Sequence, residues 1–300
     1  MRLIAGACLG AGALAGALAA TGAAGTEPEP AERFNVLRLS AYADEDDTWS
    51  TEVALDVPIG TSLRTFGTVG YSTLNLGPAL VTGSDRDVDF AYGTAGIGYE
   101  RGSFSTDLSL GLWGDEEVVA TRDLRAGAAY DNTLVGIRLT GIYRDLDLTV
   151  RRLVPDTGLV TEERSTNATG VGLELRLSPA SAWRIYAGGE TSDYEDRLEQ
   201  LLARVPARLL AQRQLTLSST FPEWTWRAGT DLFVGLHRLN LEYGADKSIF
   251  GGLESSATSL AWQFPLGATG AWALDLRVGR ADADFSETAT FGLASLTLLY

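Results

Sequence analysis

The chain contains one histidine and one cysteine, so it has few side chains that commonly serve as catalytic bases, thiolate nucleophiles or metal ligands. The histidine, His237, lies in the stretch Gly-Leu-His-Arg-Leu-Asn, which lacks the His-x-Ser-Asn pattern of some lipid hydrolases. A lone histidine near the end of a strand is more often an interfacial residue than a general base. We therefore expect no enzyme activity, and a hydrolase that uses His237 is the third of our functional hypotheses.

The sequence also gives little indication of a metal site. Asp85, Asp87 and Asp89 alternate like the first ligands of a calcium loop, but Phe90 stands where such a loop needs glycine, and no glutamate closes it. Cys8 lies in an N-terminal segment that we expect to be removed, so the mature chain would offer no thiolate. There is no basic patch of the kind that binds nucleic acid. We expect no cofactor, no metal ion and no nucleic-acid partner.

Acidic side chains are the more abundant charged groups: 39 Asp and Glu stand against 24 Lys and Arg, which gives a net charge of −15. Many of them gather in polar stretches, and a ring of carboxylates at the mouth of a pore concentrates cations and disfavours anions. The same groups could hold divalent ions that bridge to phosphate groups, or could only keep exposed loops soluble. The candidates for a pore mouth are Asp44, Glu45, Asp46, Asp47, Asp115, Glu116, Glu117, Asp282 and Asp284.

The segments between these stretches alternate between apolar and polar or small residues, as a β-strand with two different faces does. The clearest examples are residues 49–57, 108–112, 171–177 and 272–278. The positions that would face inward carry charges of both signs. Such charges either create a transverse field across a pore or satisfy one another by pairing. The pore-lining candidates are Arg138, Arg227, Asp231, Asp275 and Arg277.

Residues 290–300 indicate a final strand that ends on an aromatic residue. Leu296, Leu298 and Tyr300 fall on one face at a spacing of two, as a lipid-facing strand of a closed barrel requires. This pattern resembles the C-terminal signal by which Gram-negative outer-membrane proteins are recognised for insertion. The resemblance implies that these three residues are read by the barrel-insertion machinery.

The N-terminal residues have the pattern of a secretory signal peptide. Arg2 precedes an Ala/Gly/Leu run over residues 3–20, and small residues at 17–19 offer a cleavage site. A membrane helix is disfavoured because residues 26–30 form a polar breaker, and lipid attachment at Cys8 is disfavoured because few residues precede it. We expect a signal peptide over residues 1–25, a periplasmic segment over residues 26–33 and one barrel domain over residues 34–300.

Short turns and long polar stretches alternate along the chain, which is the asymmetry of a transmembrane barrel. The predicted short turns lie at residues 57–61, 99–104, 130–134, 178–183, 221–224 and 264–267. Aromatic residues near the predicted strand ends indicate interfacial girdles. They are Trp49, Tyr71, Tyr99, Trp113, Tyr130, Trp183, Trp224, Trp262 and Trp272. These marks predict about 14 strands, with 16 as the second choice.

Two segments are about twice as long as the roughly 10 residues that cross a bilayer. Residues 133–152 and residues 224–246 each change their alternation near the middle, at Arg144 and His237 respectively. We interpret both as strands that project beyond the membrane through a bulge. An added hairpin in these segments is the alternative.

Taken together, the mature chain resembles the porin-like superfamily of Gram-negative outer-membrane proteins. The resemblance implies an all-β, transmembrane, antiparallel up-and-down barrel in the outer membrane, with both termini in the periplasm and the long loops outside. It implies contact with outer-membrane lipid and lipopolysaccharide. The size also suits small barrels linked to polysaccharide export, such as the YaiO-type proteins.

A barrel of this size is too wide to be filled by wall side chains alone, so we expect a water-filled lumen. The favoured function is a passive, mildly cation-preferring pore for small hydrophilic solutes. The alternative is a closed or plugged barrel that serves as an envelope anchor or as an export component for an exported polymer. The stretch over residues 193–212 bears on this choice, because its leucines recur at helical spacing. It would form either a constriction inside the pore or a helix at the outer rim.

Overall fold

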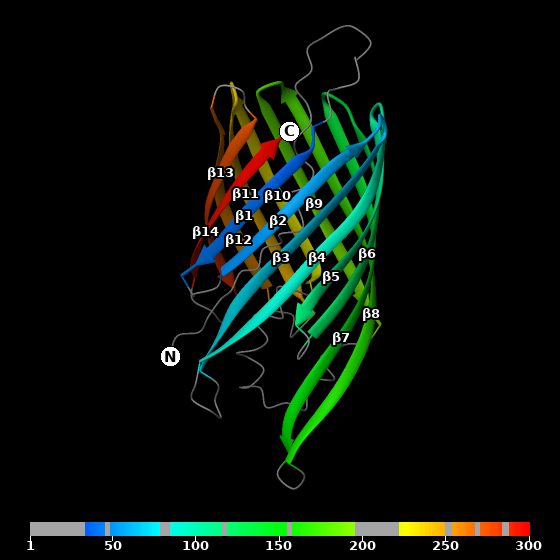
Figure 1. The fold of residues 1–300 in the computed structure, drawn as a ribbon, viewed down its shortest axis with the longest axis vertical. Coiled ribbons are helices and arrows are strands. Elements are labelled where there is room, and N and C mark those ends of the chain that lie inside the picture. The colour runs from blue at the N-terminus through cyan, green and yellow to red at the C-terminus, as the bar shows by residue number, and fades with distance from the viewer. Residues whose placement is uncertain are drawn as a thin grey trace.

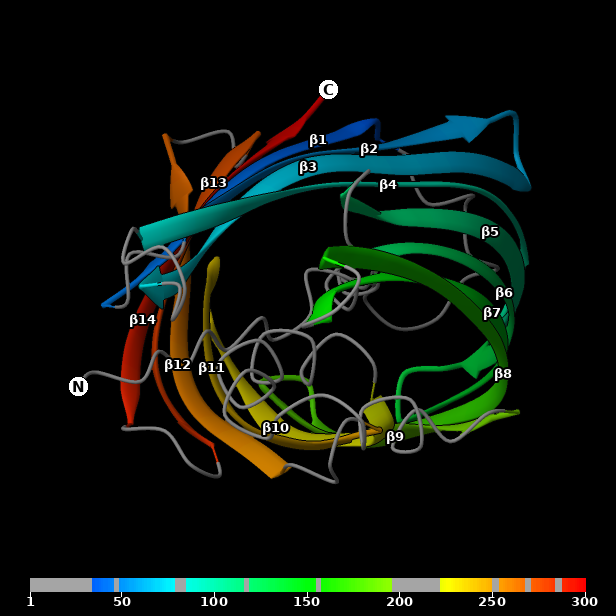
Figure 2. The ribbon, with the colours of Figure 1, turned by 90° about the horizontal axis from the view of Figure 1, so that it is seen from below.

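A computed structural model describes residues 34–45, 49–78, 85–115, 119–154, 158–195, 222–249, 254–267, 271–283 and 288–300. These residues form fourteen strands that close into one antiparallel barrel (Figures 1 and 2). The predicted fold class and strand number are therefore confirmed. The expected signal peptide and periplasmic segment lie outside the described residues. The strands are β1 (Val36–Asp44), β2 (Trp49–Ile59), β3 (Leu63–Pro78), β4 (Asp85–Arg101), β5 (Phe104–Asp115), β6 (Val119–Asp131), β7 (Val135–Val154), β8 (Gly158–Ala180), β9 (Trp183–Tyr194), β10 (Pro222–Val234), β11 (His237–Ser248), β12 (Glu254–Leu266), β13 (Trp272–Ala283) and β14 (Ala289–Leu299).

The barrel closes because the first and last strands pair with each other. β1 and β14 run antiparallel from the pair Val36 and Leu299 to the pair Asp44 and Phe291. Beyond the strands, the backbone N–H of Asn35 donates to the Tyr300 carbonyl oxygen at 2.9 Å, and the Tyr300 N–H donates back at 3.0 Å. Closure leaves no unpaired sheet edge along these strands, which a lipid environment would otherwise penalise.

Short connections gather at one end of the barrel, which we call the tight-turn end, and the other connections lie at the long-connection end (Figure 1). Gly60, Gly102 and Gly235 occupy three of the tight turns with φ of 66°, 60° and 61°. Glycine adopts this left-handed conformation without steric penalty. Another tight turn is held by Asn132, whose side-chain oxygen accepts hydrogen bonds from two backbone N–H groups at 2.8 Å.

The prediction of a bulge near Arg144 is wrong. β7 pairs with β6 and with β8 without any shift of register, and the β7–β8 hairpin extends past the other strands at the long-connection end (Figure 1). Its alternation is continuous, but its chemistry is reversed: Asp145 and Asp147 lie on the outer face, while Leu146 is fully buried on the inner face. A strand that leaves the apolar band no longer needs apolar residues on its outer face. In the sequence, the resulting exchange of apolar and polar positions looks like a shift of the alternation by one residue.

The second long segment is a hairpin, which was the alternative and not the favoured interpretation. β10 ends at Val234, β11 begins at His237, and Gly235 makes the turn between them. The predicted tight turn at residues 221–224 is also wrong, because Pro222 begins β10 and pairs with Ser248 at the long-connection end. Proline is tolerated at the first residue of a strand, so its presence alone does not indicate a turn. The prediction thus contained one turn that does not exist, at residues 221–224, and missed one, at Gly235, so the number of strands is unchanged.

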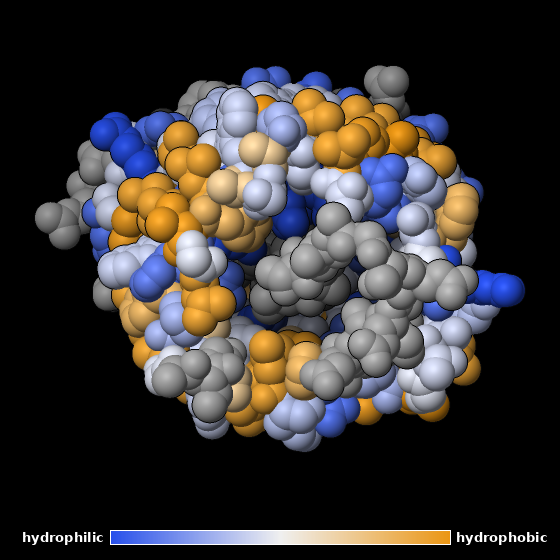
Figure 3. Space-filling view, turned by 90° about the horizontal axis from the view of Figure 1, so that it is seen from above, coloured by the Kyte–Doolittle hydropathy of each residue, from blue (hydrophilic) through white to orange (hydrophobic). Residues whose placement is uncertain are grey.

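The two faces of the wall differ in chemistry. Large apolar side chains on the outer face are exposed, such as Val69, Leu110 and Leu112 at 62–63%. Hydrophobic residues also gather over much of the outer circumference in the view from the tight-turn end (Figure 3). A band of exposed apolar side chains around a closed barrel is the surface that a lipid bilayer covers. Among the residues that the structure describes, no helix has the length and apolarity needed to span a membrane.

Aromatic residues pair on the outer face near the strand ends. Among the described residues, five pairs lie there: Trp49 with Tyr71, Phe104 with Tyr130, Trp226 with Tyr243, His237 with Trp262, and Trp262 with Phe264, with ring centroids 4.8–5.9 Å apart. Trp113 is an exception to the predicted girdle. It lies on the inner face and stacks on Phe90 with centroids 4.7 Å apart.

Rings on the inner face lie flat over glycines of the neighbouring strand. Four aromatic residues face a glycine directly across a strand pair, and a β-carbon added to any of these glycines would overlap the ring. The glycines therefore allow large side chains to lie along the wall instead of projecting into the lumen. The pairs are Phe66 with Gly96, Tyr92 with Gly70, Tyr186 with Gly229, and Phe291 with Gly279.

Candidate functional site

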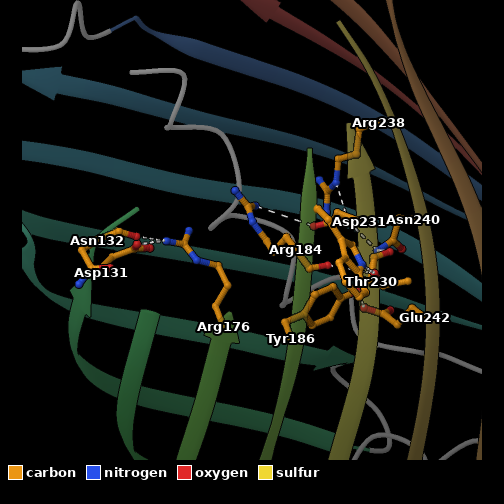
Figure 4. A network of polar contacts seen from close by, with 11 residues as sticks. Asp131, Asn132, Arg176, Arg184, Tyr186, Thr230, Asp231, Arg238, Asn240 and Glu242 are labelled. Atoms are coloured by element: carbon orange, nitrogen blue, oxygen red, sulfur yellow. Dashed lines mark hydrogen bonds and ion pairs between the residues drawn. The ribbon is translucent and has the colours of Figure 1, made fainter. Parts of the chain in front are cut away.

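The most enclosed charge of the inner wall is Asp231 on β10, whose side chain is 1% exposed. Its neighbours in the register are Arg184 on β9 and Asn240 on β11 (Figure 4). The carboxylate accepts hydrogen bonds from Arg238 Nε and from Asn240 Nδ2, both at 2.8 Å, and Arg184 Nη1 lies 3.8 Å away. A buried carboxylate needs such partners, because desolvation would otherwise make its charge very costly.

The network continues along the wall through Tyr186. Its hydroxyl donates to Glu242 at 2.6 Å and accepts from Asn240 Nδ2 at 2.9 Å (Figure 4). Glu242 also accepts a hydrogen bond from Arg277 Nη1 at 3.1 Å. Side chains from β9, β10, β11 and β13 are thereby joined into one polar layer, which fixes their positions relative to the lumen.

Two ion pairs pass over a glycine on the strand between them. Arg227 on β10 bonds Glu174 on β8 at 2.6 Å, and Gly188 of β9 lies between them in the register. Arg138 on β7 likewise bonds Asp107 on β5 at 2.5 Å across Gly127. The missing side chain lets each charged pair lie along the wall.

Further pairs lie near both ends of the lumen. Close to the tight turns, Arg64 bonds Asp56 at 2.7 Å and Glu100 at 3.1 Å, and Arg176 bonds Asp131. Towards the long-connection end, a bidentate pair joins Arg144 to Asp123 at 2.8 and 2.9 Å, and Arg125 bonds Glu190 at 3.0 Å. The wall thus carries charges of both signs, largely held in fixed pairs.

All five pore-lining candidates, Arg138, Arg227, Asp231, Asp275 and Arg277, lie on the inner face, and all but Asp275 take part in the ion pairs just described. Sequence reasoning missed other members of the wall. Arg144, Arg176, Arg184, Tyr186 and Arg238 all face inward as well. The alternation of the sequence could have identified them, because each lies one position away from an exposed apolar residue of the same strand, such as Leu177 or Ile185.

The pore-mouth candidates are dispersed. Asp44 lies on the inner face at the end of β1, where it accepts a hydrogen bond from Tyr42 at 3.1 Å, and Glu45 follows it. Asp115 ends β5. Asp282, in contrast with the expectation, lies on the outer face with its side chain 61% exposed, close to Arg280. The other candidates lie outside the described residues: Asp46, Asp47, Glu116, Glu117 and Asp284.

The predicted insertion signal and His237 lie on the outer face of the barrel. Leu296, Leu298 and Tyr300 share the outer face of β14 or its end, and their reading by the insertion machinery stays a prediction. The predicted helical stretch after Glu195 falls outside the described residues. His237 lies on the outer face, where its Nδ1 accepts a hydrogen bond from Trp262 Nε1 at 3.3 Å. Within the described ranges, no group of three or more His, Cys, Asp or Glu residues is placed to hold a metal ion.

No family model matches the chain, and no curated protein matches it in sequence. Among solved structures, it is similar to the CymD monoaromatic hydrocarbon channel, with a TM-score of 0.53 and 8% identity over 89% of this chain and 88% of that one. Outer-membrane expressed OmpT of Vibrio cholerae matches with a TM-score of 0.50 and 9% identity over 89% and 96%. The KdgM porin matches with a TM-score of 0.44 and 7% identity over 88% and 99%. The similarity to CymD and to OmpT shows that the chain has the fold of outer-membrane β-barrel proteins.

Proposed function

We propose that this chain forms a passive, mildly cation-preferring pore for small hydrophilic solutes in the outer membrane. The observation that carries the proposal is the contrast between the two faces of the wall: exposed apolar side chains outside, and charged groups of both signs inside. Inward charges suit a wet lumen, because water and pairing both offset the cost of taking them out of bulk solvent. Fourteen strands also enclose more space than wall side chains fill.

The cation preference rests on an excess of carboxylates towards the long-connection end. Among the side chains that the structure describes there, the inner wall carries two arginines, Arg125 and Arg144. The carboxylates of the same region are more numerous: Asp44, Glu52, Asp123, Glu190 and Asp246. Fixed negative charge near one mouth raises the local concentration of cations and lowers that of anions.

The orientation follows from the asymmetry of the connections. β1 begins and β14 ends at the tight-turn end. Short turns face the periplasm in barrels of this type, so we place both ends of the barrel domain there and the long connections outside, next to lipopolysaccharide. The shared fold with the CymD monoaromatic hydrocarbon channel is compatible with passive transport.

Planar-bilayer recording tests the pore. The mature chain, from about Thr26 onward, would be folded in detergent and added to one side of a bilayer under a salt gradient. We expect stable conductance steps and a reversal potential of the sign that cation preference gives. Neutralising Asp44 and Glu190 together should move that potential towards zero, whereas neutralising the outer-face Asp282 should leave it unchanged. A folded barrel without conductance would overturn the pore.

A second candidate, a partly filled barrel that serves as an anchor or export component, is favoured by one observation. Several apolar side chains on the inner face are almost fully covered, with Phe90 3%, Ile142 6% and Leu146 0% exposed. An open, water-filled lumen would leave such side chains wet. Electrical silence of a correctly folded barrel is the outcome that this candidate predicts.

A further inference from the structure

We propose that Arg184, together with Arg176 and Arg238 beside it, forms a binding subsite inside the lumen for the carboxylate group of a small monoanionic solute. The subsite lies near the tight-turn end, on β8, β9 and β11. The inference names an anionic solute class for the proposed pore and rests on that proposal for its role in transport. The subsite lies at the end opposite to the carboxylates on which the mild cation preference rests, so the two properties belong to different parts of the lumen.

The Arg184 guanidinium has few hydrogen-bond partners for a side chain that is largely buried. Its Nη1 lies 3.8 Å from the nearest Asp231 oxygen, which is beyond hydrogen-bond distance, and its Nε is buried with no hydrogen-bond partner. The side chain is only 16% exposed. A largely buried guanidinium normally donates several hydrogen bonds, because burial without them costs free energy. Within the described part of the chain, Arg184 therefore presents unused donors.

Asp231 does not depend on Arg184 for its hydrogen bonds. The carboxylate already accepts hydrogen bonds from Arg238 and from Asn240 at 2.8 Å. Asp231 therefore leaves the hydrogen-bond donors of the Arg184 guanidinium available, and an anion that enters the lumen could accept hydrogen bonds from them.

Arg184 lies between two other arginines of the inner wall. Arg184 interacts electrostatically with Arg176 on one side and with Arg238 on the other, and the three guanidinium groups follow one another along the wall (Figure 4). Within this group, two carboxylates, Asp131 and Asp231, stand against three arginines, which gives these five side chains a formal charge of +1. A surplus of this size suits a monoanion better than a doubly charged group, because further negative charge would meet the two carboxylates.

An aromatic ring limits the orientation of the Arg184 guanidinium. The Arg184 guanidinium lies over the ring of Phe233, 5.1 Å from its centroid, which limits the planes that it can adopt. A guanidinium held in one plane matches the two oxygens of a carboxylate by paired, parallel hydrogen bonds. Planarity thus favours a carboxylate over a spherical anion such as chloride.

The test uses propionate as the probe and propionamide as its neutral counterpart. The mature chain would be folded in detergent, and the side-chain Nε–Hε resonances of its arginines would be followed by NMR during each titration. We expect propionate, but not propionamide, to shift the Arg184 resonance, which its absence in Arg184→Gln identifies. Arg184→Gln should weaken propionate binding by about tenfold, equivalent to about 1.4 kcal/mol.

Two further variants serve as controls for this test. Arg122→Gln removes the same charge from the outer face, where the Arg122 side chain is 66% exposed, and should bind propionate like the wild type. Arg184→Lys keeps the charge but loses the planar fork, so its affinity should fall between those of the wild type and Arg184→Gln. This variant also serves if Arg184→Gln does not fold.

The outcomes separate this site from the pore. Equal binding by the wild type and the Arg184 variants, an equal response to propionamide, or no propionate binding at all would overturn the subsite. Bilayer recording of the same wild-type preparation reports on the pore independently. Binding that depends on Arg184 in an electrically silent barrel would keep the subsite and remove the pore, whereas conductance without such binding would do the reverse.

Discussion

Two sectors of the inner wall use the same backbone device with opposite chemistry. On β9 and β10, Tyr186 lies over Gly229 within a network of charges, whereas on β13 and β14, Phe291 lies over Gly279. Phe291 packs with the buried Ala257 and Ala281, and the partly buried Tyr42 completes this apolar sector. Directional hydrogen bonds order the first sector, and the burial of apolar surface away from water orders the second. Removing a group should therefore leave an uncompensated charge in one sector and a void in the other.

Asp231→Ala should give the largest effect, because it leaves two arginines, Arg184 and Arg238, beside a buried site without their carboxylate. We expect the free energy of unfolding to fall by about 3–5 kcal/mol. Urea unfolding of the barrel in lipid vesicles, followed by tryptophan fluorescence, measures it. Asp282→Ala on the outer face is the control and should change stability by less than about 0.5 kcal/mol. Similar values for both variants would show that the network around Asp231 contributes little.

Phe291→Ala should give the next effect, through lost burial and a void against Ala257 and Ala281. The expected loss is about 2–4 kcal/mol, somewhat less than for a ring enclosed on all sides. The same unfolding assay applies. Phe291→Leu keeps most of the apolar volume and should recover at least half of the loss. If the leucine variant is as unstable as the alanine variant, the fit of the ring over Gly279 matters more than its buried surface.

Gly229→Leu should change stability least, by about 1–3 kcal/mol from overpacking, but should alter the lumen most directly. The new β-carbon would lie within 2.5 Å of Tyr186 ring atoms and 2.8 Å from the Leu241 carbonyl oxygen, so the ring and the neighbouring backbone must both move, and single-channel conductance should fall. Gly292→Leu on the outer face is the control, because a β-carbon there meets nothing within 4 Å. Unchanged conductance in Gly229→Leu would mean that Tyr186 does not border the path of the ions.

The alternation of the strands made the fold predictable. Period-two patterns such as residues 272–278 specify both the strand and the faces of its residues, and the tight-turn glycines mark most hairpins. The errors came from places where one residue type fits two structures. Pro222 fits a turn and equally the first residue of a strand, and Trp113 fits a girdle and equally an inner stack on Phe90. Single-strand patterns do not contain the information that separates these cases.

The candidate site was predictable only in part. Inward charges could be identified from their position between apolar neighbours, as with Arg138 and Arg277. Their partners could not, because pairs such as Arg227 with Glu174 skip a strand and depend on Gly188 between them. The register of three strands decides such a contact, and a one-residue slip would remove it.

The β7–β8 hairpin offers an accessible position for an inserted epitope. β6 accompanies β7 only as far as Leu148, so residues 149–154 continue without it, a length of about 20 Å at 3.3 Å per residue. An epitope inserted between Val154 and Gly158 would therefore stand clear of the rest of the rim. On intact cells, antibody labelling of that epitope would report directly which side of the membrane the long connections occupy.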